Sequence, residues 1–146
     1  MRVGLDYGSV RIGVAKSDAT GLLASPYQSV TQQNSQHFDE LGRLITDLDA
    51  VVVYVGEPIS LKGEPTSTFT EVKAWLRELS VHLDQVPLRL LDERLTSLVA
   101  KSQMRSKGEQ PSRQKSLVDA NAAAVLLQGA LDFERIHQRW AGHSFY

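Results

Sequence analysis

Acidic residues at three separated points of the chain are the ones whose type and setting could support chemistry. The first, Asp6, lies in an opening stretch in which apolar residues alternate with glycine and with Asp6 itself. This alternation predicts a β-strand that turns at Gly8-Ser9 into a second strand ending near Lys16. An unpaired carboxylate inside such a strand is costly, so we expect a cation or strong hydrogen-bond donors to face it. The alternative is that Asp6 caps the turn through its side chain.

The second and third acidic positions follow a strand and lie in a helix. The pair Asp92-Glu93 comes directly after the apolar run Pro87–Leu91, so one of its carboxylates can reach the strand end that carries Asp6. Asp119 lies in a predicted helix from about Gln114 to Asp132, on a face rich in alanine and nearly opposite the polar stripe. We therefore expect Asp119 to face the sheet. The alternative is a capping box in which Ser116 and Asp119 begin the helix.

Three carboxylates from a first strand, a fifth strand and a last helix would form a pocket of oxygen atoms suited to Mg²⁺ or Mn²⁺. Such cations can activate a water molecule and stabilise the leaving oxygen of a phosphodiester. The chain has no cysteine. Its four histidines show no zinc-binding spacing and are expected at the surface; they are His37, His82, His137 and His143.

The net charge of −1 conceals a basic segment. Residues 94–115 carry six basic side chains and the single acid Glu109, whereas the other 124 residues carry ten basic and sixteen acidic ones. A local excess of this size favours contact with an anionic polymer, although a solvated basic loop would have the same composition.

The apolar periodicity predicts a single α/β domain with a mixed five-stranded sheet and helices on both faces. The hairpin and a third strand would form its antiparallel part, and alternating helices and strands would form the rest. Pro26 indicates an edge strand or a bulge. The expected elements after the hairpin are strand 22–30, helix 35–47, strand 50–55, a helix from Thr68, strand 87–91, a short helix capped by Thr96 or Ser97, and the last helix.

The chain length of 146 residues and its ordinary globular composition fit one domain. No run approaches the roughly 18 apolar residues of a membrane span. With no cysteine, these features favour a cytoplasmic protein.

Five short motifs, in their order and spacing, resemble the successive motifs of the YqgF family. They are Gly4–Ala15, Ala24–Pro26, Val55–Pro58, Asp92–Thr96 and Asp119–Ala123. The resemblance implies an RNase H-like fold over residues 1–132, followed by a tail, 133–146. It also implies a metal-dependent nuclease that matures the 5′ end of pre-16S rRNA or resolves Holliday junctions. By the matching motifs, the catalytic and metal-binding acids would be Asp6, Glu93 and Asp119.

The chain departs from the family pattern after the fourth strand, where Ser60 and Lys62 replace an amide and an acid. This departure affects any substrate contact that the family makes there. Glu57 adds a carboxylate that could be a fourth ligand or a solvated loop residue. The tail contains Trp140, Phe145 and Tyr146 and could pack on the body or form a patch for a partner.

Basic residues complete the expected site. Arg11 and Arg94 would stabilise charge on the scissile phosphate. The flanking nucleic-acid backbone would be held by Lys101, Arg105, Lys107, Arg113 and Lys115. The expected substrate is pre-rRNA or branched DNA, and the protein would be a monomer or a homodimer.

Two other classes of protein share some of these features. The Gly-x-Asp-x-Gly-Ser sequence also opens the phosphate loop of actin-like and sugar-kinase ATPases, but those need two such halves and this chain has one. A non-catalytic nucleic-acid-binding factor on the same fold would have the same basic segment, and an activity test would separate it from a nuclease.

Overall fold

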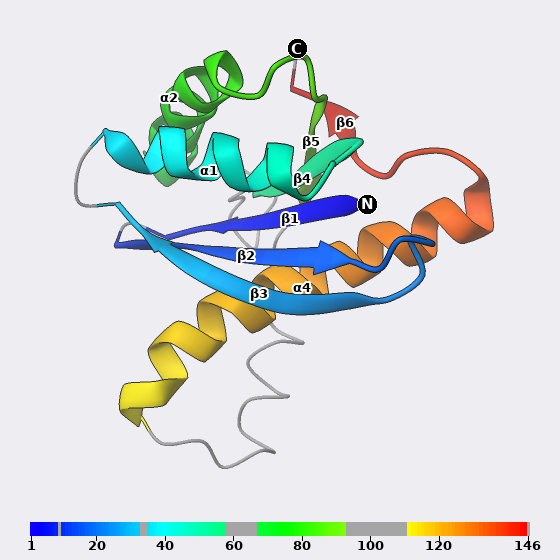
Figure 1. Ribbon diagram of the computed structural model, residues 1–146, viewed down its shortest axis with the longest axis horizontal. Coiled ribbons are helices and arrows are strands. Elements are labelled where there is room, and N and C mark those ends of the chain that lie inside the picture. Colours follow the sequence, from blue (N-terminus) through cyan, green and yellow to red (C-terminus); the bar gives the residue numbers. More distant parts are fainter. Residues whose placement is uncertain (9, 33–34, 58–66, 93–110, 146) are drawn as a thin grey trace.

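The structure is a computed structural model that describes residues 1–8, 10–32, 35–57, 67–92 and 111–145 (Figure 1). For residues 57, 67–69, 92 and 111–119 it describes the backbone only. The described strands form one mixed sheet in the order β3-β2-β1-β4-β5-β6. The predicted α/β class and the mixed sheet are confirmed.

The antiparallel half of the sheet comes from the first 31 residues. Strand β1, Arg2–Tyr7, pairs with β2, Arg11–Ser17, and β2 pairs with β3, Ala24–Thr31. The predicted hairpin is therefore present. β3 is an edge strand. Its register with β2 shifts between Val14, which pairs with Gln28, and Ala15, which pairs with Pro26. Proline lacks the N–H that an inner strand needs, so an edge with a bulge accommodates it.

The parallel half follows from alternating helices and strands. Helix α1, Gln36–Asp47, leads to β4, Val52–Glu57, and helix α2, Ser67–Val81, leads to β5, Leu88–Asp92. β4 pairs in parallel with both β1 and β5. Its side chains from Val52 to Val55 are fully buried, as the β-branched run predicts for a central strand covered on both faces.

The sheet has six strands rather than the predicted five, because the tail contributes β6, His143–Ser144. β6 pairs antiparallel with β5. Arg89 on β5 donates from its Nε and Nη2 atoms to the carbonyl oxygens of Ala141 and Gly142, at 3.0 and 2.8 Å. A two-residue strand has no periodicity of its own, so sequence pattern could not predict it.

Helices α1 and α2 lie on one face of the sheet and α4 on the other (Figure 1), and a hydrophobic core fills each side. On one face, α1 and α2 pack on side chains such as Leu5 and Val55. On the other, helix α4, Pro111–His137, crosses the strands and packs on Ala15, Val52 and Tyr54. None of the described helices combines the length and apolar character that crossing a bilayer requires.

Helix α4 is longer than predicted at both ends, starting at Pro111 rather than about Gln114 and ending at His137 rather than Asp132. Proline is favoured in the first turn, where a missing N–H breaks no helical hydrogen bond. The short helix predicted near Thr96 lies outside the described residues.

His37 is buried, with 7% of its surface exposed, and the expectation of a surface position is wrong for it. The Trp75 indole Nε1 donates to His37 Nε2 at 2.8 Å. This contact joins α1 to α2, and only the packing of the two helices creates it.

Candidate active site

The carboxyl ends of three parallel strands meet at one end of the sheet. Leu5 on β1 is level with Val55 on β4, which is level with Leu90 on β5. Asp6 lies one residue beyond Leu5, and Asp92 lies two residues beyond Leu90, in register with Glu57. Since neighbouring strands are about 4.8 Å apart, the backbones of Asp6 and the β5 end are separated by about 10 Å across the sheet.

Helix α4 brings a further acid to this end because it runs antiparallel to β1. Arg2, at the start of β1, contacts Glu134 near the end of α4, with Nη2 and Oε1 3.0 Å apart. Gly4 faces an earlier part of the helix: a Cβ there would lie 2.9 Å from the Leu127 Cβ and 3.0 Å from the Ala123 carbonyl oxygen. Later residues of β1 therefore contact earlier residues of α4.

By the same progression we expect Asp119 to lie near Asp6. Side chains two residues apart on a strand share a face, so Asp6 follows Gly4 on the face covered by α4. Two strand residues span about 6.7 Å, close to the 6 Å that four helical residues span. Four residues before Ala123 is Asp119. We name the positions Asp6, Glu57, Asp92 and Asp119 the acidic end of the sheet.

The capping-box alternative for Asp119 is wrong, because α4 begins at Pro111 and both Ser116 and Asp119 are interior helical positions. Asp119 shares its helical face with Ala123, Leu126 and Ala130, which are all buried. The described part of this face turns toward the sheet, and a sheet-facing Asp119 stays a prediction.

Asp6 is partly buried and pairs in the ladder with Gly13 on β2. Arg11, also partly buried, is the first residue of β2 and lies two residues from Gly13, so it belongs to the same face of the sheet as Asp6. Both Asp6 and Arg11 have polar or electrostatic partners in the folded chain. The hairpin register thus brings the carboxylate residue Asp6 and the basic residue Arg11 to the acidic end.

Several residues proposed from sequence lie outside the described residues: Glu93, Arg94, Lys101, Arg105 and Lys107, with Ser60 and Lys62 of the divergent loop. Arg113 and Lys115 are positions in the first turns of α4, before Asp119. Within the described residues, no three His, Cys, Asp or Glu side chains form a metal-holding group. Glu93 and the side chain of Asp119 lie outside the described part of the chain.

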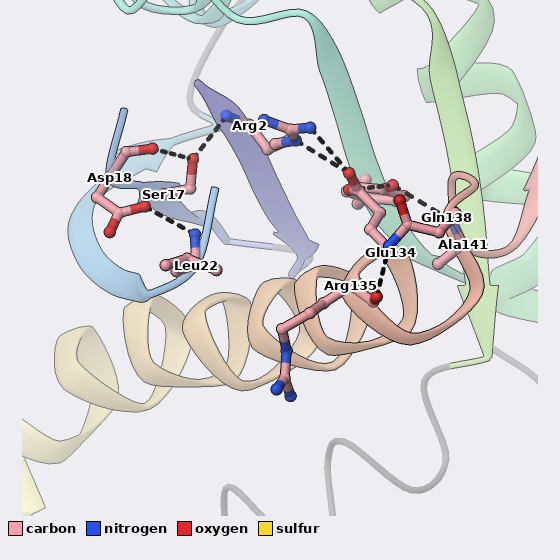
Figure 2. Close-up of polar contacts among 9 residues, drawn as sticks. Arg2, Ser17, Asp18, Leu22, Glu134, Arg135, Gln138 and Ala141 are labelled. Atoms are coloured by element: carbon pink, nitrogen blue, oxygen red, sulfur yellow. Dashed lines mark hydrogen bonds and ion pairs between the residues drawn. The ribbon is translucent and has the colours of Figure 1, made fainter. Parts of the chain in front are cut away.

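Sequence reasoning missed the polar contacts that hold α4 on the sheet. Figure 2 shows the Arg2 side chain extending from β1 to Glu134 on α4. The buried Tyr54 hydroxyl on β4 donates to Glu134 Oε2 at 2.7 Å. Burial, with the hydrogen bond to Glu134, raises the pKa of Tyr54 well above its ordinary value. No sequence pattern connects positions 2, 54 and 134. The only signal, a weak one, is that Glu134 is an acid near the end of the mostly apolar face of α4.

A hollow of about 440 Å³ lies away from the acidic end, between α1 and His82. Its lining includes Asp39, Arg43 and Asp47. It contains none of the residues that the sequence proposed for chemistry.

Solved structures with a similar fold define the class of protein. A structure of RuvC from Thermus thermophilus in complex with a Holliday junction substrate matches with a TM-score of 0.58 and 18% identity, over 92% of this chain and 94% of that chain. A second Thermus thermophilus RuvC structure matches with a TM-score of 0.55 and 16% identity, over 93% and 96%. The chain thus has the RNase H-like fold.

Sequence comparison narrows the class to a family. Residues 1–133 match the family model of RuvX, described as Holliday junction resolvase. The chain belongs to this family, and the resemblance to the YqgF family is confirmed.

Relatives named "Putative pre-16S rRNA nuclease" match almost the whole chain. The protein from Leifsonia xyli subsp. xyli is 39% identical over 98% of this chain and 92% of its own length. Those from Mycolicibacterium paratuberculosis and Streptomyces coelicolor are 38% and 36% identical, each over 97% of this chain and 85% of their own length.

Proposed function

We propose that the protein is a metal-dependent nuclease that hydrolyses phosphodiester bonds, with Asp6, Glu93 and Asp119 as its catalytic acids. The observation that carries this proposal is the close packing of α4 on β1 at Gly4, from which we expect Asp119 to lie near Asp6 on one face of the sheet. Glu93 follows directly on Asp92, which ends β5 at the same end of the sheet. Membership of the RuvX family supports a nuclease on independent grounds.

The substrate that we favour is the 5′ end of pre-16S rRNA, in the cytoplasm. The relatives that match nearly the full chain carry a pre-16S rRNA nuclease name, at 36 to 39% identity. A four-way DNA junction is the second candidate, favoured by the description of the matching family and by the junction bound to the RuvC neighbour. Symmetric cleavage of a junction would need a homodimer, whereas cleavage of one RNA strand needs only a monomer.

The donor set fits a hard divalent cation. Three carboxylates with no cysteine or histidine among them suit Mg²⁺ or Mn²⁺ better than zinc. When bound, such a cation would lower the pKa of water and neutralise charge on the phosphate. Asp6, Glu93 and Asp119 would hold it. Strand alternation gives position 57 the face of Val55, opposite that of Asp6, so Glu57 is poorly placed as a fourth ligand.

The chain's own residues would position the substrate. Asp6 is held in the β-ladder opposite Gly13, so its backbone is fixed before substrate binds. Arg11 and Arg94 would offset charge on the scissile phosphate. Lys101, Arg105, Lys107, Arg113 and Lys115 would hold the flanking backbone.

The decisive experiment compares two labelled substrates, a pre-16S rRNA 5′ leader and a four-way DNA junction, with Mg²⁺, with Mn²⁺ or with a chelator. We expect metal-dependent cleavage of the RNA leader in preference to the junction. Cleavage of the junction alone would reverse the choice of substrate. Binding of both substrates without cleavage under any metal condition would contradict the nuclease and favour a non-catalytic binding factor.

Replacement of Asp6 by Asn should abolish cleavage and leave nucleic-acid binding within about twofold, because the basic segment and not Asp6 supplies affinity. Asp18→Asn is a matched control. Asp18 is exposed in the turn after β2, where its Oδ1 accepts from the Leu22 N–H, and we expect wild-type turnover. Wild-type cleavage by Asp6→Asn would exclude Asp6 as a catalytic acid.

A further inference from the structure

Glu134 connects α4 to two different strands through its two carboxylate oxygens. Oε1 accepts from Arg2 Nε on β1 at 3.1 Å and lies 3.0 Å from Arg2 Nη2. Oε2 accepts from the Tyr54 hydroxyl on β4 at 2.7 Å. The Tyr54 oxygen in turn accepts from the Ala141 N–H at 3.3 Å, so the segment after α4 is held at the same point.

These contacts are protected from water. Tyr54 is fully buried, and the side chains of Glu134 and Arg2 are only 12% and 25% exposed. Hydrogen bonds to a charged group in such surroundings are directional and costly to break, because the groups left behind cannot recover water. Glu134 therefore fixes both the rotation of α4 and its position along β1.

The remaining contacts of α4 with the inner strands are mostly apolar and therefore non-directional. On the buried face Ala123 and Ala130 are small, whereas Leu126, Leu127 and Leu131 are large and fill the core. Gln128 adds a tie to the start of β3, where its Oε1 accepts from the Ala24 N–H at 2.8 Å. Among the described residues of α4, Glu134 is the acid that joins β1 directly.

We propose that Glu134 is a positioning residue, which holds α4 in the register that sets Asp119 opposite Asp6. This inference rests on the proposed nuclease site. Glu134 lies fifteen residues from Asp119, about 22 Å along a straight helix, so it acts through the helix and does not touch the reacting atoms. A shift of about 1 Å in a catalytic group can reduce turnover by as much as 10²-fold.

The test uses the full-length protein and three variants. Glu134→Ala removes the contacts with both Arg2 and Tyr54. Tyr54→Phe keeps the buried ring and removes only the hydroxyl. Glu134→Gln keeps an oxygen that can accept from Arg2 and an amide that can donate to the Tyr54 oxygen, so it keeps both contacts while removing the charge and the acceptor of the Tyr54 hydroxyl hydrogen. The readouts are Mn²⁺ affinity by titration calorimetry, kcat and KM for the cleaved substrate, and thermal melting.

We expect Glu134→Ala to lower kcat and weaken Mn²⁺ binding by about tenfold each, with KM unchanged, because the basic segment binds the nucleic acid. Tyr54→Phe should show a smaller change in the same direction. Glu134→Gln should melt at a lower temperature than wild type and yet keep kcat and Mn²⁺ affinity within about twofold.

A matched core variant separates positioning from general loss of stability. Val53→Ala, on β4 beside Tyr54, removes volume from the opposite core and should lower the melting temperature without changing kcat or Mn²⁺ affinity, measured well below melting. Equal losses in Val53→Ala and Glu134→Ala, or wild-type kcat and Mn²⁺ affinity in Glu134→Ala, would overturn the positioning role. A wild type that binds Mn²⁺ and cleaves nothing would contradict the proposed nuclease, while the Mn²⁺ affinities would still decide the role of Glu134.

Discussion

Asp6 lies where an acid is least expected, in an inner strand between β2 and β4. Its ladder position opposite Gly13 and the covering helix α4 limit how far its carboxylate can move from the acidic end. If Asp119 and Glu93 lie close to it, as we propose, three ionised groups repel one another unless a cation offsets their charge.

Neutralising Asp6 should therefore stabilise the metal-free protein. We expect metal-free Asp6→Asn to be more stable than wild type by about 1 kcal/mol, since active-site charge clusters often reduce stability. Mg²⁺ should raise the melting temperature of the wild type, because it binds the native state, and should raise it less in the variant. Thermal melts of both proteins with and without Mg²⁺ check this. A variant that melts below wild type, with no response to Mg²⁺ in either protein, would indicate that the acids are not clustered.

Tyr54 gives a prediction on pH dependence. Its pKa is raised in the folded protein, chiefly by burial and then by Glu134. Above about pH 10 the unfolded chain releases this proton while the folded protein keeps it, so stability falls as pH rises. The contribution is fully present below pH 10 and is lost at up to about 1.4 kcal/mol per pH unit above it.

Denaturant unfolding of wild type and Tyr54→Phe between pH 9 and pH 11 measures this effect. The difference in unfolding free energy should shift in favour of the phenylalanine variant as pH rises. Tyr27→Phe, at an exposed position on β3, is the control and should retain the wild-type slope. Parallel pH profiles for wild type and Tyr54→Phe would contradict the raised pKa.

At the scale of elements, the contact between α4 and β1 depends on a glycine. Gly4 has no side chain, so the helix backbone at Ala123 can approach the strand closely. The same helix contains Gly129, which is exposed and has nothing within 4 Å of the position that a Cβ would take. These two glycines offer a matched pair of substitutions.

Gly4→Ala should push α4 away from β1, destabilise the protein by about 1–3 kcal/mol and reduce cleavage. Gly129→Ala should stabilise it by about 0.5–1 kcal/mol, because alanine favours the helix and nothing obstructs it. Urea unfolding and cleavage assays of both variants check the pair. If Gly4→Ala kept full stability and activity, the close approach would have no part in forming the site.

At the scale of the whole molecule, charge is divided between a basic segment, 94–115, and a body that carries an excess of acids. Helix α1 adds to the acidic side with exposed Asp39 and Glu40, whereas α2 carries two acids and two bases. This division favours binding of nucleic acid from the side of the basic segment and disfavours it at α1.

Replacing Lys107 and Arg113 by Ala should weaken nucleic-acid binding and flatten its salt dependence by close to one unit of log–log slope per lost phosphate contact. Replacing Arg43 and Arg77, which are exposed on α1 and α2, removes the same charge and should leave the slope unchanged. Filter binding or anisotropy across a range of salt concentrations measures both. An unchanged slope in the Lys107 and Arg113 double variant would indicate that the nucleic acid binds at a different surface.

The sequence by itself determined the elements whose signal is local. The alternation around Asp6 predicted the β1–β2 hairpin, and the β-branched run before Gly56 predicted a buried central strand. The spacing of apolar residues in α4 predicted the buried face that carries Ala123, Leu126 and Ala130. Each of these signals depends on side chains within a few residues of one another, where strand and helix periods can be read directly.

Only the tertiary structure decided how these elements meet. β6 forms because Arg89 and the β5 backbone hold a segment with no strand pattern, and His37 is buried because Trp75 packs beside it. Glu134 joins Arg2 and Tyr54, which are 132 and 80 residues away along the chain. Hydrogen bonds over such separations form only once the chain has folded, so periodicity identifies the candidate acids but not the contacts that set their register.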